Sequence, residues 1–231
     1  MTFLVLLGAP GAGKGTQAPI LAARLGLPHV ATGDLFRAAV HEGSAVGLEA
    51  RRYMERGQLV PDSITVKMLL DRLAQPDAGP GAILDGFPRN LAQADILDGA
   101  LADRSSRVNV ALEIEVPEDE LVRRLSGRWI CKANGHVYNE TSHPPRVPGR
   151  CDLDDSPLIQ REDDRSETVA ARLAAQLTAL REVVGYYTQR GLLRKIDGRR
   201  PVAEVTQALV AAALAAAAAD ETGSQPRGAG N

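Results

Sequence analysis

The sequence predicts an α/β fold, a five-stranded parallel sheet flanked by helices, and three observations carry this prediction. Short apolar runs recur along the chain, and turn or capping residues follow each of them. Helical patterns separate the runs, which favours crossover connections and a sheet that is covered on both faces. A glycine-rich segment joins the first run directly to a helical pattern, as in α/β folds that bind a ligand at the ends of their strands.

Five apolar runs are the predicted strands, at residues 3–7, 29–31, 82–85, 110–116 and 192–196. The clearest helix is predicted where apolar residues recur at steps of three and four, because such residues share one face. They are Val169, Leu173, Leu177, Leu180, Val184 and Tyr187. Alanine propensity continues a last helix to about residue 219, whereas residues 220–231 are polar and glycine-rich and are predicted to be a disordered tail.

Length and composition set bounds on the class of protein. With 231 residues, 44% of them hydrophobic, the chain can bury one substantial core with small insertions. The formal net charge of −2 argues against a nucleic-acid partner. Two cysteines, no apolar run of eighteen residues and a start without basic flanks argue against a disulfide scaffold, a membrane span and a signal peptide. We therefore expect a cytoplasmic protein, and a monomer because no large extra apolar face stands out.

Two segments interrupt the alternation of strands and helices. Residues 32–61 hold two short helical patterns with no strand between them, and residues 127–164 are rich in Gly, Pro, Asn, His and Asp. Segments of this length inside a compact fold are usually functional lids or small subdomains. We therefore divide the chain into a core of residues 1–31, 62–126 and 165–219, with 32–61 and 127–164 as insertions over the ligand-binding edge of the sheet.

Residues 8–16 read GAPGAGKGT and form the most specific motif of the chain. Gly8 and Gly13 are separated by four residues, Lys14 follows, and the motif lies between an apolar run and a helical pattern. This spacing and context are those of a phosphate-binding loop, in which backbone N–H groups and the helix N-terminus bind phosphate oxygens. The alternative, a glycine-rich turn without a ligand, does not explain why motif, strand and helix coincide. The motif therefore predicts a P-loop NTPase fold.

A lysine at position 14 suits this loop, although the chain has only four lysines. A compact ammonium on a flexible stem follows a moving phosphate as a point charge, whereas the planar fork of Arg favours fixed bidentate geometry. Gly15 departs from the motif, because it occupies the position that usually holds Ser or Thr, and Thr16 follows it. Direct ligation of Mg²⁺ by a hydroxyl of the loop is therefore in doubt.

Arginines lie at the ends of elements and in the insertions, at Arg37, Arg89, Arg128 and Arg161. Arg124 adds to this group, and Arg172 lies on the long predicted helix. Any one of them could be a solvated surface residue. Together they favour phosphoryl transfer, which needs alignment of several phosphates and neutralisation of their charge rather than a protein nucleophile.

Eight stretches of the chain occur in the order in which adenylate kinases have them. They are GAPGAGKGTQA, TGDLFRAAV, GQLVPD, LDGFPRNLAQA, GRWIC, HVYN, QREDDRSETVAARL and IDGRRPV, and the resemblance covers residues 3 to about 210. The chain thus resembles adenylate kinases of the bacterial long-lid type. The resemblance implies a nucleoside-monophosphate-binding insertion and a lid. It also implies reversible, Mg²⁺-dependent transfer of the γ-phosphoryl group of ATP to AMP, which gives two ADP.

The resemblance also implies roles for individual residues. ATP would be bound by Gly11, Ala12, Gly13, Lys14, Gly15 and Thr16, by Arg128, Val137 and Tyr138 of the lid, and by the backbone around Arg200. AMP would be bound by Thr32, Arg37, Gln58, Leu59, Val60, Gly86, Phe87, Pro88, Arg89, Gln93, Arg161 and Arg172, with Thr32 and Gln93 near the base. The implied catalytic residues are Lys14, Arg89, Arg124, Arg128, Arg161 and Arg172, of which Arg124, Arg161 and Arg172 would bracket the transferring group.

Asp34 and Asp85, each at the end of a strand-like run, resemble the carboxylates that hold Mg²⁺ through water in this family. The alternative for Asp34 is an N-terminal helix cap. For Asp85, which precedes Gly86, the alternative is an ordinary turn residue.

The lid raises the question of a metal. In zinc-bearing lids of the family the ligand positions are spaced by two, sixteen and two residues, and here they hold Cys131, Asn134, Cys151 and Asp154. Asn134 offers only a neutral amide oxygen, whereas zinc prefers Cys, His or carboxylate. His136 or His143 could substitute, although a loop His is more often solvated or bonded to backbone. We therefore expect a hydrogen-bonded hairpin rather than zinc, and the reducing compartment disfavours a disulfide between the two cysteines.

Three other functions stay open as alternatives. A guanylate or pyrimidine-nucleotide kinase would share the core and many of the arginines, but the long lid and Thr32 favour AMP by the family pattern. A P-loop hydrolase would need a residue that positions water and a Ser or Thr at position 15, and neither is apparent. A non-catalytic nucleotide-binding module would be indicated by loss of Lys14 or of the lid arginines, which are present.

Overall fold

The structure is a computed structural model, and it describes residues 1–140, 143–160, 164 and 166–223. Its centre is a parallel sheet of five strands in the order β2–β3–β1–β4–β8. The strands are β1 (Thr2–Leu7), β2 (His29–Ala31), β3 (Gly81–Asp85), β4 (Val108–Glu115) and β8 (Leu193–Asp197). The predicted five-stranded parallel sheet is confirmed, with boundaries that differ by one or two residues.

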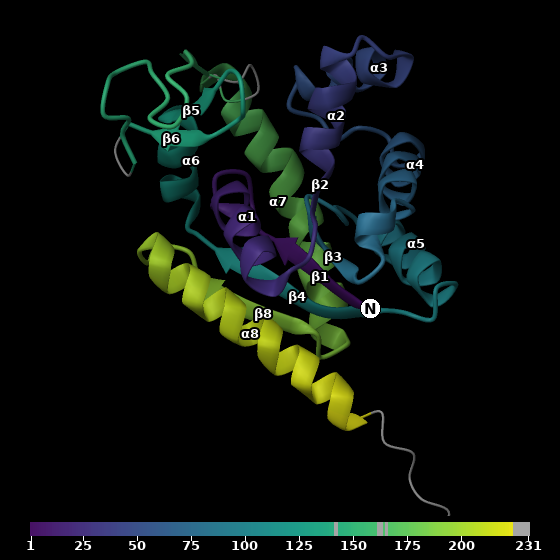
Figure 1. Ribbon diagram of the computed structural model, residues 1–231. Helices are drawn as coiled ribbons and strands as arrows, with labels where there is room; N and C mark the ends of the chain where they lie inside the picture. Colours follow the sequence, from purple (N-terminus) through teal and green to yellow (C-terminus); the bar gives the residue numbers. More distant parts are fainter. Residues whose placement is uncertain (141–142, 161–163, 165, 224–231) are drawn as a thin grey trace, which may run out of the picture.

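Helices cover both faces of this sheet (Figure 1). On one face lie α1 (Lys14–Leu25) and α8 (Val202–Gly223), and on the other lie α4 (Asp62–Leu73), α5 (Leu91–Ala102) and much of α7 (Ser166–Gln189). Successive side chains of β1 alternate between the two cores: Phe3, Val5 and Leu7 pack with α4, α5 and α7, and Leu4 and Leu6 with α1 and α8. A strand buried on both faces must be apolar throughout, which explains the continuous run FLVLL.

The long helix α7 has the predicted apolar stripe. Val169, Leu173 and Tyr187 are buried in the cores, and Leu177, Leu180 and Val184 pack against them while partly buried. A short 3₁₀ turn (Pro76–Ala78) precedes β3, and α6 (Glu118–Ser126) follows β4.

Two further helices, α2 (Thr32–His41) and α3 (Ala45–Met54), lie between β2 and α4. They project from the sheet at the same end as the β5–β6 region, on the opposite side of α7 (Figure 1). Ser44 caps α3 by accepting the N–H of Gly47 at 3.1 Å. Gly47 also lets the two helices approach, since a Cβ there would lie 2.1 Å from the carbonyl oxygen of Ala39.

The segment after α6 folds into a second, antiparallel sheet in the order β6–β5–β7. Its strands are β5 (Arg128–Cys131), β6 (Val137–Asn139) and β7 (Leu158–Ile159). They surround a small core of Cys131, Tyr138, Cys151 and Leu158. The sequence did not predict these strands, because runs of two to four residues are too short to show a period.

The C-terminal end differs from the prediction in two respects. Helix α8 runs to Gly223, so residues 220–223 are helical rather than part of a disordered tail, and residues 224–231 lie outside the described part. Helix propagation adds one hydrogen bond per residue, which carries the alanine-rich helix into the polar segment. The window Val202–Ala219 is also long and apolar enough to cross a membrane, by length and composition alone, although no such run was expected. A single helix of this kind is weak evidence for a span; 22% of the window is buried, and Val205, Leu209 and Ala213 pack on the sheet.

Candidate active site at the carboxyl edge of the sheet

The phosphate loop, residues 8–13, joins β1 to α1 at the carboxyl edge of the sheet. Gly8, Gly11 and Gly13 have φ values of 147°, 84° and 103°, which side chains rarely permit. A Cβ at Gly8 would also lie 2.9 Å from the carbonyl oxygen of Ile114. The loop therefore depends on glycine both for its turns and for its close packing, and it leads into the N-terminus of α1, where unpaired N–H groups favour an anion.

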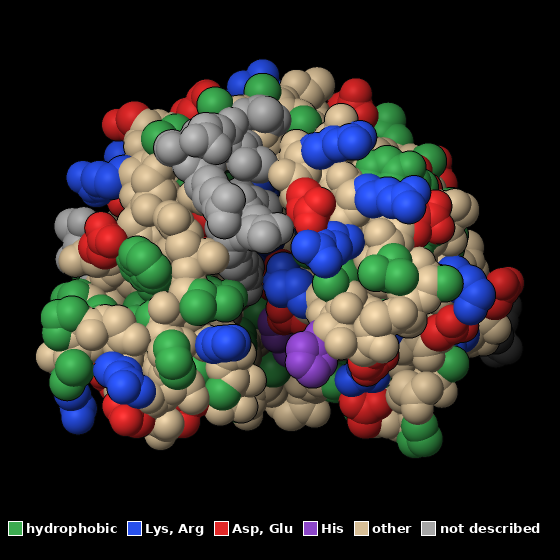
Figure 2. Space-filling view, turned by 90° about the horizontal axis from the view of Figure 1, so that it is seen from above, with side chains coloured by type: hydrophobic (Ala, Val, Ile, Leu, Met, Phe, Trp, Pro, Cys, Tyr) green, Lys and Arg blue, Asp and Glu red, His purple; other side chains and the backbone are tan. Residues whose placement is uncertain are grey.

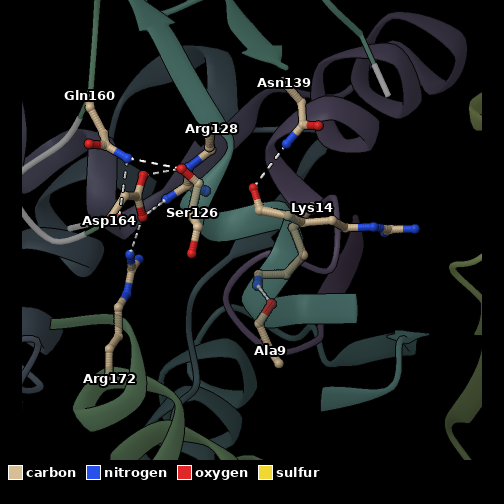
Figure 3. A network of polar contacts seen from close by, with 9 residues as sticks. Ala9, Lys14, Ser126, Arg128, Asn139, Gln160, Asp164 and Arg172 are labelled. Carbon is tan, nitrogen blue, oxygen red and sulfur yellow. Dashed lines mark hydrogen bonds and ion pairs between the residues drawn. The ribbon is translucent and has the colours of Figure 1, made fainter. Parts of the chain in front are cut away.

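Lys14 is the first residue of α1, and its ammonium folds back over the loop (Figure 3). Nζ donates hydrogen bonds to the carbonyl oxygens of Gly8 at 2.6 Å and Ala9 at 3.1 Å. Burial lowers the pKa of Lys14 to about 8, and the charge of Asp85 opposes this shift. The positive charges of neighbouring arginines contribute to the same lowering: Arg89, Arg172 and Arg128. Lys14 is thus a desolvated cation among other cations, and an anion would relieve their mutual repulsion.

Asp85, at the end of β3, is the carboxylate beside this cation. It is 8% exposed, and its Oδ2 lies 3.3 Å from Nε2 of His29. Burial would raise the pKa of Asp85, but the hydrogen bond with His29 and the charge of Lys14 outweigh burial and hold the pKa below its usual range. Asp85 therefore stays ionised, and its hard oxygen atoms are donors of the kind that Mg²⁺ prefers.

Asp34 lies in the first turn of α2 and forms an ion pair with Arg37. The N-cap of α2 is Ala31, and no side-chain hydrogen bond caps that helix. The alternative of Asp34 as a helix cap therefore has no support in the structure.

Asp164 joins the lid to the core and is fully buried (Figure 3). Arg128 of β5 donates to it through Nε at 2.6 Å and through Nη2, and Nη1 of Arg172 on α7 donates at 2.8 Å. One carboxylate thus holds two of the implied catalytic arginines in place. Asp164 was not predicted from the sequence, because the run QREDDRS does not show which of its carboxylates is buried.

A groove between α2, the segment before α4 and the turn after β3 gathers most of the residues implied for AMP. Its lining includes Thr32, Arg37, Gln58, Leu59, Val60, Arg89, Gln93 and Arg172. It also includes residues that were not predicted: Gly33, Phe36, Met54, Gly57, Thr65 and Gln176. Figure 2 shows the molecule hollowed on this face, with Lys and Arg side chains at the border of the hollow.

Gly86 connects two residues that line this groove. Its carbonyl oxygen accepts hydrogen bonds from Oγ1 of Thr32 at 2.9 Å and from Nε of Arg89 at 2.7 Å. Its φ is 77°, and a Cβ there would lie 3.0 Å from Oγ1 of Thr32. Of its implied neighbours, Phe87 turns away into the core and is 1% exposed.

Other implied residues lie elsewhere. Arg124 donates to Glu120 at 2.8 Å and to the carbonyl oxygen of Gly198 at 2.9 Å, so these contacts give no support to the prediction that it brackets the transferring group. Tyr138 buries its ring in the lid core, while Arg200 is exposed beyond β8. Arg161 lies outside the described residues.

Comparisons with known proteins agree with this geometry. A family model described as Adenylate kinase matches residues 6–192. The adenylate kinase of Streptomyces griseus is 49% identical over 204 residues, which are 88% of this chain and 93% of that protein. The adenylate kinase of Moorella thermoacetica is 47% identical over 206 residues (89% and 95%), and that of Staphylococcus aureus is 43% identical over 207 residues (90% and 96%).

The chain belongs to the adenylate kinase family. Adenylate kinases are nucleoside monophosphate kinases, enzymes that convert Mg·ATP and AMP to two ADP. The predictions of the family, of a P-loop NTPase fold and of adenylate kinase function are therefore confirmed.

The lid of this family member brings four metal-binding side chains together. The ligand atoms of Cys131, His136, Cys151 and Asp154 all lie within 4.8 Å of one another, and both cysteines are free thiols. Asn134 is bonded to the cluster rather than part of it, because its Nδ2 donates to Oδ2 of Asp154 at 2.6 Å. That bond and the N–H of Ser156 hold the pKa of Asp154 well below its usual range.

Proposed function

We propose that the chain carries out the adenylate kinase reaction with ATP on the phosphate loop and AMP in the groove between α2, the segment before α4 and the turn after β3. The observation that carries this assignment is the position of Lys14, which contacts the loop and lies among Arg89, Arg128 and Arg172. With ATP on the phosphate loop and AMP in the groove, the phosphates of both nucleotides would meet this one group of cations. Phosphoryl transfer needs that arrangement, because charge must be neutralised while donor and acceptor oxygens are held in line.

In this proposal an oxygen of the AMP phosphate attacks the γ-phosphorus of ATP, and the bond from that phosphorus to the β-phosphate oxygen breaks. Arg172 and Arg89, which line the groove, would stabilise the acceptor and the transferring group, and Arg128 would reach ATP from the lid. Val137 and Tyr138 would contact ATP through their backbone, since the ring of Tyr138 is buried in the lid. Arg124 would lie near the nucleoside of ATP rather than its phosphates. This placement is supported by its hydrogen bond to the carbonyl oxygen of Gly198, two residues before Arg200.

Mg²⁺ would enter with ATP and supply charge neutralisation at its phosphates. Asp85 fits a role in holding its water shell, because it is a buried, ionised carboxylate beside Lys14. Asp34 is 62% exposed, and its ion pair with Arg37 is made through Oδ1, so Oδ2 would accept a hydrogen bond from a water of Mg²⁺.

We further propose that residues 32–61 and 127–164 are arms that move against the core formed by 1–31, 62–126 and 165–219. Lid closure is an established behaviour of this family, and the proposal concerns where the arms lie in this chain. Closure would exclude water and so protect ATP from hydrolysis. Distances between spectroscopic labels on exposed Val147 of the lid and exposed Arg194 of the core are expected to shorten when a bisubstrate analogue binds. Unchanged distances would contradict the assignment.

We also propose that the chain acts as a cytoplasmic monomer with no nucleic-acid partner. The formal net charge of −2 supports the absence of a nucleic-acid partner. Sedimentation at micromolar concentration is expected to give the mass of one chain, and a dimer mass would refute the monomer.

The test of the function is the rate of ADP formation from Mg·ATP with AMP, GMP, CMP and UMP in parallel. AMP is expected to be used best. Turnover with UMP and none with AMP would reverse the assignment in favour of a pyrimidine-nucleotide kinase, and turnover with none of them would overturn it.

The lid cluster supports a structural Zn²⁺, although the sequence analysis favoured a hairpin without metal. Two thiolates, an imidazole and a carboxylate form a donor set that zinc accepts in tetrahedral sites, and His136 supplies the donor that Asn134 lacks. We propose that Cys131, His136, Cys151 and Asp154 hold one ion and thereby tie β5, β6 and the loop before β7 together.

Protein purified without chelator is expected to contain close to one zinc per chain. Cys151→Ser should remove the metal and lower the unfolding temperature of the lid, because the ion crosslinks three segments. His143→Ala is the matched control, since His143 stacks on Tyr138 and is outside the cluster. If the wild type contains no zinc and its lid is as stable as with added zinc, the lid is a hydrogen-bonded hairpin without metal.

A further inference from the structure

A partly buried carboxylate that has no implied role in substrate binding lies next to the AMP groove. Asp62 is the first residue of α4, and its Oδ1 accepts a hydrogen bond from Nε2 of Gln93 at 2.6 Å. Both of its oxygens also lie 3.0 Å from Nδ2 of Asn90. Asp62 therefore bonds to the amides of two residues at the start of α5.

Each of these amides has its other end fixed as well. Oε1 of Gln93 accepts the backbone N–H of Arg89 at 2.8 Å. Oδ1 of Asn90 accepts the backbone N–H of Gln93 at 2.8 Å and so caps α5. An ionised carboxylate accepts hydrogen bonds and donates none, so both amides must turn their NH₂ groups toward Asp62. A flipped amide would place its carbonyl oxygen against the carboxylate and lose two hydrogen bonds.

Because the amide of Gln93 is fixed, it offers a base its donor and its acceptor in one arrangement only. Gln93 is 1% exposed and lines the AMP groove. A primary amide has two lone pairs and two N–H bonds, and Arg89 and Asp62 take one of each. The remaining acceptor and donor lie side by side on the same amide. They complement the 6-amino group and N1 of adenine, and they oppose the 6-oxo group and N1–H of hypoxanthine or guanine.

We propose that Asp62 is a positioning residue that sets the preference for adenine by fixing the orientation of the Gln93 amide. This inference rests on the proposed function, in which Gln93 lies near the base of AMP. Asp62 itself needs no contact with the nucleotide. It acts because an acceptor-only group behind Gln93 forbids the amide orientation that a 6-oxopurine would need.

The test compares AMP with IMP, which differ at position 6 and at the N1 proton. Asp62→Asn replaces the acceptor-only group by an amide that can also donate, so that a flip of Gln93 then loses only the hydrogen bond from the backbone N–H of Arg89. The ratio of kcat/KM for AMP to that for IMP is expected to fall about tenfold, the effect of one hydrogen bond of ordinary strength. The fall should come mainly through the two KM values, since the phosphates and their arginines are unchanged.

Two further variants separate positioning from general damage. Asp71→Asn removes an exposed carboxylate on the same helix, paired only with exposed Lys67, and should leave the AMP to IMP ratio unchanged. Asp62→Glu keeps an acceptor-only head group and should retain more of the wild-type ratio than Asp62→Asn. If Asp62→Asn does not fold, NMR of the wild type decides: the Gln93 side-chain NH₂ signals should already show slow exchange with water in the free enzyme and should move with AMP.

A folded Asp62→Asn variant with the wild-type ratio would overturn the inference, and so would an equal loss with both substrates. Rapidly exchanging Gln93 NH₂ signals would overturn it too. These results would leave the proposed function intact if the wild type converts AMP. A wild type that does not use AMP would instead refute the proposed function itself.

Discussion

Replacement of Lys14 by methionine is expected to lower kcat by about a thousandfold, within the range measured when one charged group is removed from a phosphoryl-transfer or oxyanion site. Lys14 is the cation that contacts the phosphate loop directly, through the carbonyl oxygens of Gly8 and Ala9. A phosphate would attract Nζ away from these carbonyls, and the ammonium would then follow the charge as it moves from donor to acceptor. Methionine fills similar space but supplies no charge.

The fold should survive this change. The pKa of Lys14 is lowered from 10.5 to about 8, so the folded state binds this proton less tightly than the unfolded chain. Below about pH 8 the charged group therefore opposes folding, and its penalty disappears as the pH rises from about 8 to 10.5. The Lys14→Met variant should have an equal or higher unfolding temperature at pH 7, and it should lack the gain in stability across that pH window.

The measurement is a coupled assay of ADP formation beside a thermal unfolding curve. Lys67→Met is the matched control, because Lys67 is 74% exposed and pairs with Asp71 on the surface of α4. The control should keep wild-type kcat. Wild-type turnover in a folded Lys14→Met variant would contradict the role given to this lysine.

Replacement of Arg172 by alanine is expected to have an effect at least as large, a fall in kcat of about ten-thousandfold, as for other arginines that stabilise a transferring phosphoryl group. Arg172 lines the AMP groove, adds to the positive field at Lys14 and donates to Asp164. Among the described residues, Arg172 thus connects the AMP groove, the surroundings of Lys14 and Asp164. Arg172→Lys keeps the charge but loses the fork, so it should recover only part of the rate.

Stability must be followed in the same experiment. Asp164 is fully buried, and removal of one donor costs about 1–3 kcal/mol when a buried acceptor loses its partner, although Arg128 remains to pair with it. Arg181→Ala is the control on the same helix, because its side chain is exposed on α7. Equal kcat values for Arg172→Ala and Arg181→Ala would show that Arg172 does not act on the phosphoryl group.

Lys14 and Asp164 differ in whether their roles could be predicted from the sequence. Lys14 was predicted from nine consecutive residues, because the loop, its preceding strand and its following helix are contiguous in the chain. Asp164 was missed, because its meaning depends on Arg128 and Arg172, which lie 36 and 8 residues away. The AMP groove lies between these cases: the resemblance implied eight of its lining residues, whereas Gln176 enters it only through the packing of α7.

The lid shows the same limit. Ligand spacing placed Asn134 in the frame with Cys131 and Cys151, but the hairpin turns His136 into the cluster and leaves Asn134 bonded to Asp154. Spacing counts residues along the chain, while a metal-binding cluster depends on the direction of each side chain at a turn. The length of α8 was underestimated for a different reason. Propagation of an existing helix outweighs the weak helix propensity of its last residues.

The sequence by itself determined the parallel sheet, the phosphate loop and the family, because hydrophobic period, glycine positions and short motifs are local properties of the chain. Only the tertiary structure decided which carboxylates and amides face one another: Asp164 between two arginines, Asp85 beside Lys14, and Asp62 behind Gln93. The physical reason is that a hydrogen bond or an ion pair depends on distance and direction in space. Residues separated by 31 positions, such as Asp62 and Gln93, acquire both only when α4 and α5 pack on the same sheet.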